Sequence, residues 1–240
     1  MTKEELKKLR ENMGDFPILR EKSADLLWKI VEKLKPNMVL ELGSGKGFSG
    51  CSILSAYDKV NLLTIEKEPE NYRSAMENYV KGEFFERVLP VNADAVEVVE
   101  RLANAKNKQQ FDLIVLDCNK SSYVKMADNL IELLSPEGVL FADDVLYFGK
   151  VMEEHEEDEL PEKKHRTIIM NLRKFIDKIE SDKRLKNVVL YEVEDGVLVA
   201  VKKTDEEIAS STDEVAPMQR IVIDTTPATP AKAKKTETEE

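Results

Sequence analysis

Short apolar runs alternate with amphipathic stretches between Met38 and Asp144. Runs of four to six apolar residues are too short for three helical turns and favour buried strands. Amphipathic stretches, such as Ser23 to Leu34, place their apolar residues on one helical face. The pattern predicts five strands alternating with helices, which is typical of a doubly wound parallel α/β sheet. The predicted strands span 38–42, 60–65, 87–91, 111–116 and 139–142.

The pattern changes after a predicted helix at 162–179. Two apolar runs, 187–193 and 197–202, are separated by Glu194-Asp195-Gly196, and this spacing indicates an antiparallel hairpin. A parallel sheet that ends in such a hairpin is the seven-stranded, Rossmann-like arrangement of methyltransferases, and it differs from two mononucleotide-binding halves. We therefore predict one domain over residues 1–203.

Residues 204–240 are rich in Thr, Ala, Pro, Lys and Glu. Too little apolar surface can be buried there to offset the entropy of ordering, so we predict a disordered tail. One apolar run, Ile221-Val222-Ile223, interrupts this tail. An alternative for the run is an edge strand added to another molecule.

Charge and composition exclude some partners. The net charge is −11 and the pI about 5.0, so no overall field attracts nucleic acid or anionic lipid. Apolar runs are too short for a membrane span, and the charged start lacks a signal-peptide core. Both cysteines, Cys51 and Cys118, fall in predicted core elements. We expect a reduced, cytoplasmic protein without a membrane partner.

The stretch Glu41-Leu42-Gly43-Ser44-Gly45-Lys46-Gly47 joins the first strand to a helix. A glycine turn lets the backbone approach a ligand, and the free N–H groups and dipole of a helix N-terminus attract an anion. This arrangement predicts a nucleotide-like cofactor site. The run Gly45 to Gly50 also fits the dinucleotide fingerprint G-x-G-x-x-G, which leaves NAD as an alternative.

Polar residues follow the predicted strands, where ligands of open α/β sheets bind. Glu66 ends the second strand, and its carboxylate can accept hydrogen bonds from both ribose hydroxyls. A solvated acid at a strand end is the alternative. Asp94 can accept from an adenine amino group, and it can equally cap the helix that follows it.

Three carboxylates follow the fourth and fifth strands: Asp117 and the pair Asp143-Asp144. If those strands are neighbours, the carboxylates meet at one edge of the cofactor crevice and repel unless a cation lies between them. A set of oxygen ligands selects Mg²⁺ or Mn²⁺ over zinc. Lys120 is near enough in sequence to reach the same site. Alternatively, Asp117 caps a helix and Asp144 faces water.

The segments Asp117 to Tyr123 and Phe141 to Val151 together resemble the metal-dependent O-methyltransferase family of catechol and caffeoyl-CoA methyltransferases and their bacterial relatives. The glycine stretch resembles motif I of class I S-adenosylmethionine (SAM) methyltransferases. The resemblance implies metal ligands at Asp117, Asp143 and Asp144. It also implies a catalytic role for Lys120 and Asp117. One departure is Asp144, where the family usually has Asn.

We expect the cofactor SAM to contact several residues at the strand ends and in the glycine turn. These are Glu41, Gly43, Gly45, Gly47, Ser49, Glu66, Asp94 and Asp117. The family chemistry implies that a Mg²⁺ ion binds a hydroxyl of a small catechol-like or polyhydroxylated acceptor and lowers its pKa. Lys120, if its own pKa is depressed, accepts the proton, or it stabilises the oxyanion.

Three alternatives remain from the sequence. A hydroxylated tRNA uridine is a second acceptor, favoured by the basic cluster at 163–166 and disfavoured by the acidic balance. A catalytically silent SAM-binding protein is another. The third alternative, an NAD-dependent oxidoreductase, is disfavoured because the sequence shows no second domain to hold its substrate. The acidic segment 153–159, including His155, is interpreted as a solvated loop or a lid. We expect a homodimer.

Overall fold

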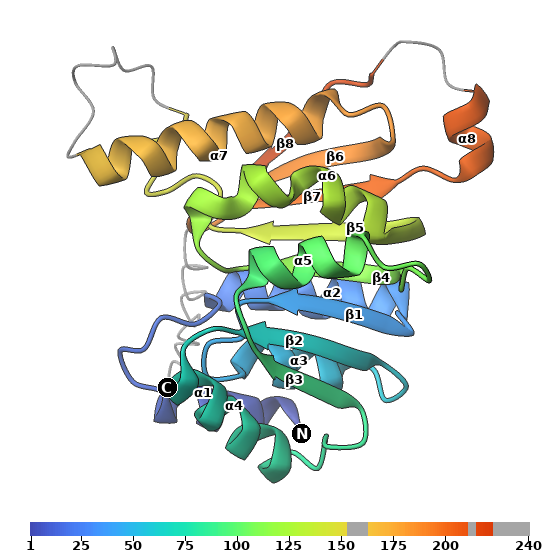
Figure 1. The fold of residues 1–240 in the computed structure, drawn as a ribbon. Coiled ribbons are helices and arrows are strands. Elements are labelled where there is room, and N and C mark those ends of the chain that lie inside the picture. Colours follow the sequence, from blue (N-terminus) through green and yellow to red (C-terminus); the bar gives the residue numbers. More distant parts are fainter. Residues whose placement is uncertain (153–162, 211–214, 223–240) are drawn as a thin grey trace, which may run out of the picture.

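The computed structural model describes residues 1–152, 163–210 and 215–222 (Figure 1). Helices and strands alternate through the chain, as the pattern of apolar residues predicts. In chain order the elements are α1 (Lys3–Asn12), α2 (Glu21–Leu34), β1 (Met38–Leu42), α3 (Phe48–Ala56), β2 (Asn61–Glu66), α4 (Pro69–Lys81), β3 (Val88–Asn92), α5 (Ala95–Ala103), β4 (Phe111–Leu116), the 3₁₀ turn η1 (Lys120–Ser122), α6 (Tyr123–Leu133), β5 (Leu134–Asp143), α7 (Lys163–Ser181), β6 (Leu185–Glu192), β7 (Val197–Lys202), α8 (Asp205–Ser210) and β8 (Gln219–Val222).

Eight strands of the described residues form a single sheet in the order β3-β2-β1-β4-β5-β7-β6-β8. The first five strands along the chain pair in parallel, and β7 runs antiparallel to both β5 and β6. The predicted α/β fold with a closing antiparallel hairpin is therefore confirmed. Strands β4 and β5 are direct neighbours, which brings their carboxyl ends together.

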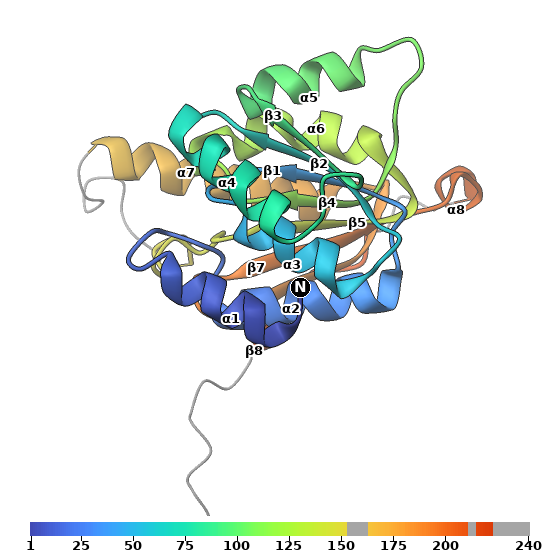
Figure 2. The ribbon, with the colours of Figure 1, turned by 90° about the horizontal axis from the view of Figure 1, so that it is seen from below.

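Helices cover both faces of the sheet. Figure 2 shows α5 and α6 on one side and α1, α2 and α3 on the other. Side chains alternate between the two layers because successive residues of a strand point to opposite faces. In β1, Leu40 and Leu42 join the core beneath α5, α6 and α7, whereas Val39 joins the core beneath α1 to α4. This alternation places Glu41 on the second face, where it is fully buried.

Helix starts near the site are fixed by specific side chains. Asp94 caps α5 by accepting the Val96 N–H at 2.9 Å. Helix α2 has no local side-chain cap, and instead Glu194 from the β6–β7 turn accepts the N–H groups of Lys22 and Ser23 at 3.1 and 3.0 Å. The carboxylate also complements the positive end of the helix dipole. The hairpin therefore fixes where α2 begins.

Two local predictions differ from the structure. The sequence pattern predicts that the fifth strand begins at residue 139, but β5 begins at Leu134 and includes residues 135–138. Glu137 adopts φ +63° there, and the register with β4 shifts between Phe111 and Leu113. The strand passes through the irregularity because Phe111 pairs with Leu134.

The predicted tail also contains structure. Helix α8 and strand β8 lie within 204–240, so the expectation of disorder is wrong for those two elements. Strand β8 pairs in parallel with β6 of the same chain, not with another molecule. The run forms a strand because it covers the edge that β6 would otherwise expose. Arg220 Nε also donates a hydrogen bond to Glu192 at 2.6 Å. The boundary at 203 stays a prediction.

No helix among the described residues is both long enough and apolar enough to cross a bilayer. The acidic segment 153–159, with His155, lies outside the described residues, so neither interpretation of it is tested.

Candidate active site

The glycine turn is bonded to the end of the neighbouring strand. Gly43 and Ser44 donate their N–H groups to the carbonyl of Ile65, at 2.9 and 3.2 Å. Gly43 has φ +96°, and a Cβ there would lie 2.2 Å from the backbone oxygen of Asp117. A side chain at position 43 would therefore separate β1 from β4. Glycine is needed here because two strand ends approach each other so closely.

A cavity of about 310 Å³ opens at the carboxyl ends of these strands. Most of the predicted cofactor residues line it: Gly43, Gly45, Ser49, Glu66, Asp94 and Asp117. The three aspartates of the predicted metal site and Lys120 line the same cavity. A segment that the sequence did not single out, residues 16–19, also borders it. The cofactor and acceptor regions are thus parts of one space.

Gly47 does not line this cavity, and its expected cofactor contact stays a prediction. It ends the turn with φ +86° and is the N-cap of α3. A Cβ at Gly47 would lie 3.1 Å from Ala75, and one at Gly50 would lie 2.4 Å from the Tyr79 hydroxyl. These two glycines therefore make room for helix α4. The sequence spacing alone could not distinguish this role from a ligand contact.

Glu41 is also absent from the cavity wall and is 0% exposed. It accepts a hydrogen bond from the Thr64 hydroxyl at 2.5 Å, while its Oε1 has no hydrogen-bond partner among the described residues. Burial raises the pKa of Glu41 to about 7, against the opposing hydrogen bonds from Ser49 and Thr64. The carboxyl therefore lies beneath the turn, and its expected contact with the cofactor stays a prediction.

Glu66 is held in place by backbone donors. Its Oε2 accepts the Gly45 N–H and its Oε1 accepts the Glu68 N–H, both at 2.8 Å. Each carboxylate oxygen keeps a second lone pair. The fixed carboxylate lines the cavity and remains able to accept from two hydroxyls. Asp94 lines the cavity as well while it caps α5, so the capping role is confirmed and the adenine contact stays a prediction.

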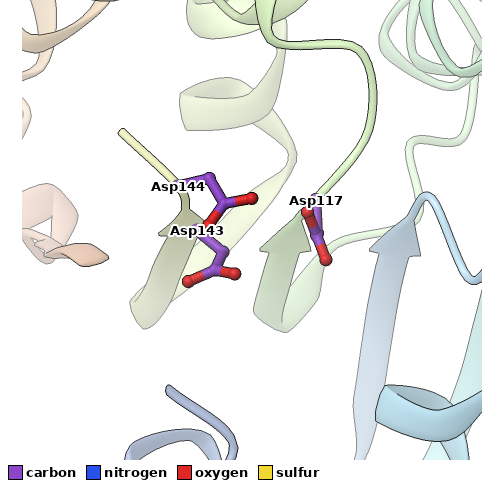
Figure 3. A group of neighbouring side chains, drawn as sticks. All are labelled: Asp117, Asp143 and Asp144. Atoms are coloured by element: carbon purple, nitrogen blue, oxygen red, sulfur yellow. The ribbon is translucent and has the colours of Figure 1, made fainter. Parts of the chain in front are cut away.

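Asp117, Asp143 and Asp144 face a common space between the ends of β4 and β5 (Figure 3). One carboxylate oxygen from each lies within 4.8 Å of the others. Burial, with the charges of Asp117 and Asp144, raises the pKa of Asp143 well above its usual range. Burial also raises the pKa of Asp117, against the attraction of Lys120. This concentration of carboxylates is the arrangement that a cation relieves.

Lys120 lies inside the cluster. Its Nζ is 2.6 Å from Oδ1 of Asp117 and 3.3 Å from Oδ2 of Asp144. Burial acts to lower the pKa of Lys120, but the acidic groups of Tyr123, Asp117 and Asp144 outweigh it and raise the pKa well above its usual value. The sequence interpretation of Lys120 as proton acceptor depends on a pKa that is depressed beside a bound cation, and it stays a prediction.

Two further residues near the site, Ser23 and Asp195, were not identified from the sequence. Ser23 is buried on the first turn of α2, and its side chain acts to lower the pKa of Asp143. Asp195, from the β6–β7 turn, accepts the N–H of Phe148 and lies 3.7 Å from Arg20. The sequence did not single them out because Ser23 fits an ordinary helix start and Asp195 fits an ordinary hairpin turn. Only the packing of α2 against the hairpin brings them together.

Comparison with known proteins decides the family. The sequence model of the O-methyltransferase family matches residues 3–203. The chain belongs to the O-methyltransferase family. The predicted family and enzyme class are thereby confirmed, and the NAD-dependent oxidoreductase is excluded.

Relatives of this O-methyltransferase include enzymes of plant metabolism. A flavonoid 3′,5′-methyltransferase of Vitis vinifera is 26% identical over 72% of this chain and 77% of its own length. A caffeoyl-CoA O-methyltransferase of Populus kitakamiensis is 26% identical over 61% of this chain and 63% of its own. In alignments with plant relatives the chain spans from 56% to 77% of the relative's length.

Solved structures share the fold. The O-methyltransferase TomG of Streptomyces achromogenes, in complex with SAM, has a TM-score of 0.71 and 20% identity, covering 85% of this chain and 92% of TomG. An O-methyltransferase of Bacillus cereus, in complex with SAH, has a TM-score of 0.69 and 19% identity, covering 83% and 90%. These similarities place the glycine turn and the acidic cluster in a known fold.

Proposed function

We propose that this O-methyltransferase transfers the methyl group of SAM to a hydroxyl of a small catechol-like or polyhydroxylated acceptor, with a divalent cation at Asp117, Asp143 and Asp144. The observation that supports this most strongly is the meeting of three carboxylates, within 4.8 Å of one another, on the wall of the cavity that the glycine turn also lines. A methyl donor and an activated oxygen must meet in one such space.

The cofactor half of the cavity fits SAM. Glu66 offers two fixed oxygens to a diol, and the turn residues Gly43 and Gly45 leave backbone exposed to the cavity. Ser49, on the first turn of α3, lies where N–H groups and the helix dipole favour a carboxylate. TomG, which has this fold, was solved with SAM. The chain thus holds the donor through its ribose and its methionine end.

The acidic half fits a hard divalent ion. Mg²⁺ and Mn²⁺ prefer carboxylate oxygens, and the three aspartates offer oxygens from two adjoining strand ends. When bound, the ion supplies Lewis-acid polarisation of an acceptor hydroxyl. Asp143 is buried, and Ser23 on α2 acts to lower the pKa of its carboxyl. Asp117 is oriented by the contact of its backbone with Gly43 and by Lys120.

Lys120 completes the acceptor region. Its Nζ contacts both Asp117 and Asp144, so it lies within reach of an oxygen held at the same carboxylates. We assign to Lys120 the orientation of the acceptor oxygen and the stabilisation of the charge that develops on it. The hydroxyl gives up its proton to water, the S–CH₃ bond of SAM breaks as the O–CH₃ bond forms, and SAH leaves. Positioning of oxygen and methyl at near-attack distance supplies much of the remaining acceleration.

The acceptor is tested by offering two classes of substrate. Methyl transfer from labelled SAM is measured with catechol and with total tRNA, each with Mg²⁺. We expect transfer to catechol and none to tRNA. His165, part of the basic cluster that favours tRNA, lies 2.6 Å from the Tyr147 hydroxyl through its Nδ1 and is engaged inside the protein. Transfer to tRNA alone would replace the small acceptor by the alternative, and binding of SAM without any transfer would support a silent binding protein.

A further inference from the structure

The loop after β5 is hydrogen-bonded to the turn that joins β6 to β7. Pairing of β5 with β7 continues up to Asp143, which lies opposite Val197. Two further backbone hydrogen bonds follow, from the N–H groups of Val145 and Leu146 to the carbonyls of Gly196 and Asp195, at 3.1 and 2.9 Å. Asp144 is thus placed between two residues that are both fixed to this hairpin.

Asp144 leaves the strand in a left-handed conformation, with φ +55°. In a regular strand, consecutive side chains point to opposite faces of the sheet. Asp143 and Asp144 are consecutive, yet each has a carboxylate oxygen within 4.8 Å of one from Asp117 (Figure 3). The left-handed conformation at Asp144 lets both carboxylates face the same space. The proposed set of cation ligands therefore depends on the backbone conformation of this loop.

The loop holds two more residues in the same uncommon conformation. Tyr147 and Phe148 have φ +47° and +58°, which bulky residues rarely adopt. Such conformations persist where the surrounding structure holds them in place. Val145 and Leu146 anchor the start of the loop in the core, whereas Phe148 is 68% exposed. The Phe148 side chain therefore does not fix this part of the loop.

The side chain of Asp195 fixes it through the backbone. Its Oδ1 accepts the N–H of Phe148, and the Asp195 side chain is only 5% exposed. Its Oδ2 lies 3.7 Å from the Arg20 guanidinium, which is too long for a hydrogen bond. Burying a carboxylate is costly unless it is hydrogen-bonded, so the bond to Phe148 is the contact that favours this burial. The turn is held in its own place because Glu194 accepts the N–H groups at the start of α2.

We propose that Asp195 is a positioning residue for the cation. By accepting the Phe148 N–H, it keeps the loop in the conformation that turns the Asp144 carboxylate toward the other two aspartates. The inference rests on the proposed function, because it concerns the cation ligands of the same site. Asp195 does not touch the cation in this role, so an uncharged acceptor of the same shape serves equally well.

Direct binding of Mn²⁺ tests this role without relying on turnover. Mn²⁺ is titrated into the protein, and the free ion is measured by electron paramagnetic resonance. Asp195→Ala removes the acceptor, and we expect the dissociation constant for Mn²⁺ to rise about tenfold, the order of one hydrogen bond to a charged group. Asp195→Asn keeps an acceptor oxygen and loses the charge, and it should stay within about twofold of the unmodified protein. The dissociation constant for SAM, measured by calorimetry, should be the same in all three proteins.

Asp112→Ala is the matched control for lost charge and lost stability. Asp112 also accepts backbone N–H groups, those of Asn37 and Met38 at 2.8 and 3.1 Å, but near the amino end of β4 and outside the cavity. This variant should bind Mn²⁺ within about twofold of the unmodified protein. If Asp195→Ala does not fold, Asp195→Glu takes its place: it keeps the charge, displaces the carboxylate by one methylene and should also weaken Mn²⁺ binding.

Several results would count against this role. Unchanged Mn²⁺ affinity in Asp195→Ala, or in the Asp195→Glu variant that replaces it, would make the contact purely structural. Equal losses in Asp195→Asn and Asp195→Ala would mean that the charge of Asp195 acts on the cation at long range. Either result, or an equal loss in Asp112→Ala, would overturn the inference alone. Absence of Mn²⁺ binding in the unmodified protein would contradict the proposed cation and overturn this inference with it.

Discussion

The Nζ of Lys120 lies 3.3 Å from Oδ2 of Asp144, the residue that departs from the Asn that the family resemblance leads us to expect. The Asp144 carboxylate, the third of the cluster, therefore adds a negative charge and also pairs with the lysine. The added charge and the pairing with Lys120 both change how the proposed cation would bind. A third carboxylate strengthens cation binding and weakens the pull of the cation on an acceptor oxygen.

Asp144→Asn should reverse that balance. We expect the apparent affinity for Mg²⁺ to fall by about tenfold, the order of one charge-assisted contact, and kcat at saturating Mg²⁺ to rise. Titration of activity with Mg²⁺ at saturating SAM and catechol measures both. Asp58→Asn, an exposed change of the same type outside the cavity, is the control. Tighter Mg²⁺ binding in Asp144→Asn would contradict this role.

Lys120→Met should reduce turnover by about 10²- to 10⁴-fold, the range for a group that acts on a proton or its charge. The ammonium contacts Asp117 at 2.6 Å and is assigned to the acceptor, so the dissociation constant for SAM should change little. Single-turnover kinetics and calorimetry measure the two effects. Lys125→Met, on the exposed face of α6, serves as control. Turnover near the unmodified level would remove Lys120 from the reaction.

Glu41→Gln tests the buried acid beneath the turn. Since burial raises the pKa of Glu41 to about 7 from 4.5, the folded chain keeps a proton that the unfolded chain releases. The protonated Glu41 therefore contributes to the free energy of unfolding at low pH, and this contribution is lost as pH rises from about 4.5 to about 7. Glutamine cannot ionise. At pH 8 the variant should be more stable to unfolding by up to about 3 kcal/mol, and at pH 4 nearly equal.

Urea denaturation at the two pH values measures this difference. The control is Glu32→Gln, an exposed change on α2, which should not alter the pH dependence. A variant that lost stability equally at both pH values would show that the Glu41 carboxyl is needed for packing and does not titrate as described.

Gly50→Ala tests the fit between α3 and α4. Within a helix, this change ordinarily stabilises by about 0.5–1 kcal/mol. At Gly50 the added Cβ would lie 2.4 Å from the Tyr79 hydroxyl, so we expect a loss of about 1–3 kcal/mol. Thermal unfolding measures it, and Tyr79→Phe in the same chain should restore part of the loss. A stabilised Gly50→Ala would mean that Tyr79 does not occupy this space.

The sheet and the acidic cluster could be predicted because their signals are local. Each strand is a short apolar run, and parallel strands place their last residues at one edge, so Asp117, Asp143 and Asp144 had to meet once β4 and β5 were neighbours. Glu66 and Asp94 followed from the same rule.

Other features depend on packing that no local pattern encodes. Gly47 matched a cofactor motif, yet its space is used by α4, which comes more than twenty residues later. Glu41 matched the same motif and is closed off beneath the turn. The relation of Arg20 to Asp195 joins the two ends of the domain, and only the folded hairpin creates it.

The most direct test of the proposed cation is the dependence of methyl transfer on Mg²⁺. Labelled SAM and catechol are incubated with the unmodified enzyme and with Asp117→Ala, each in Mg²⁺ or in EDTA, while calorimetry follows SAM binding. We predict that turnover requires Mg²⁺ in the unmodified enzyme and is abolished in Asp117→Ala, although that variant still binds SAM. Full activity of either protein in EDTA would contradict a cation at the three aspartates.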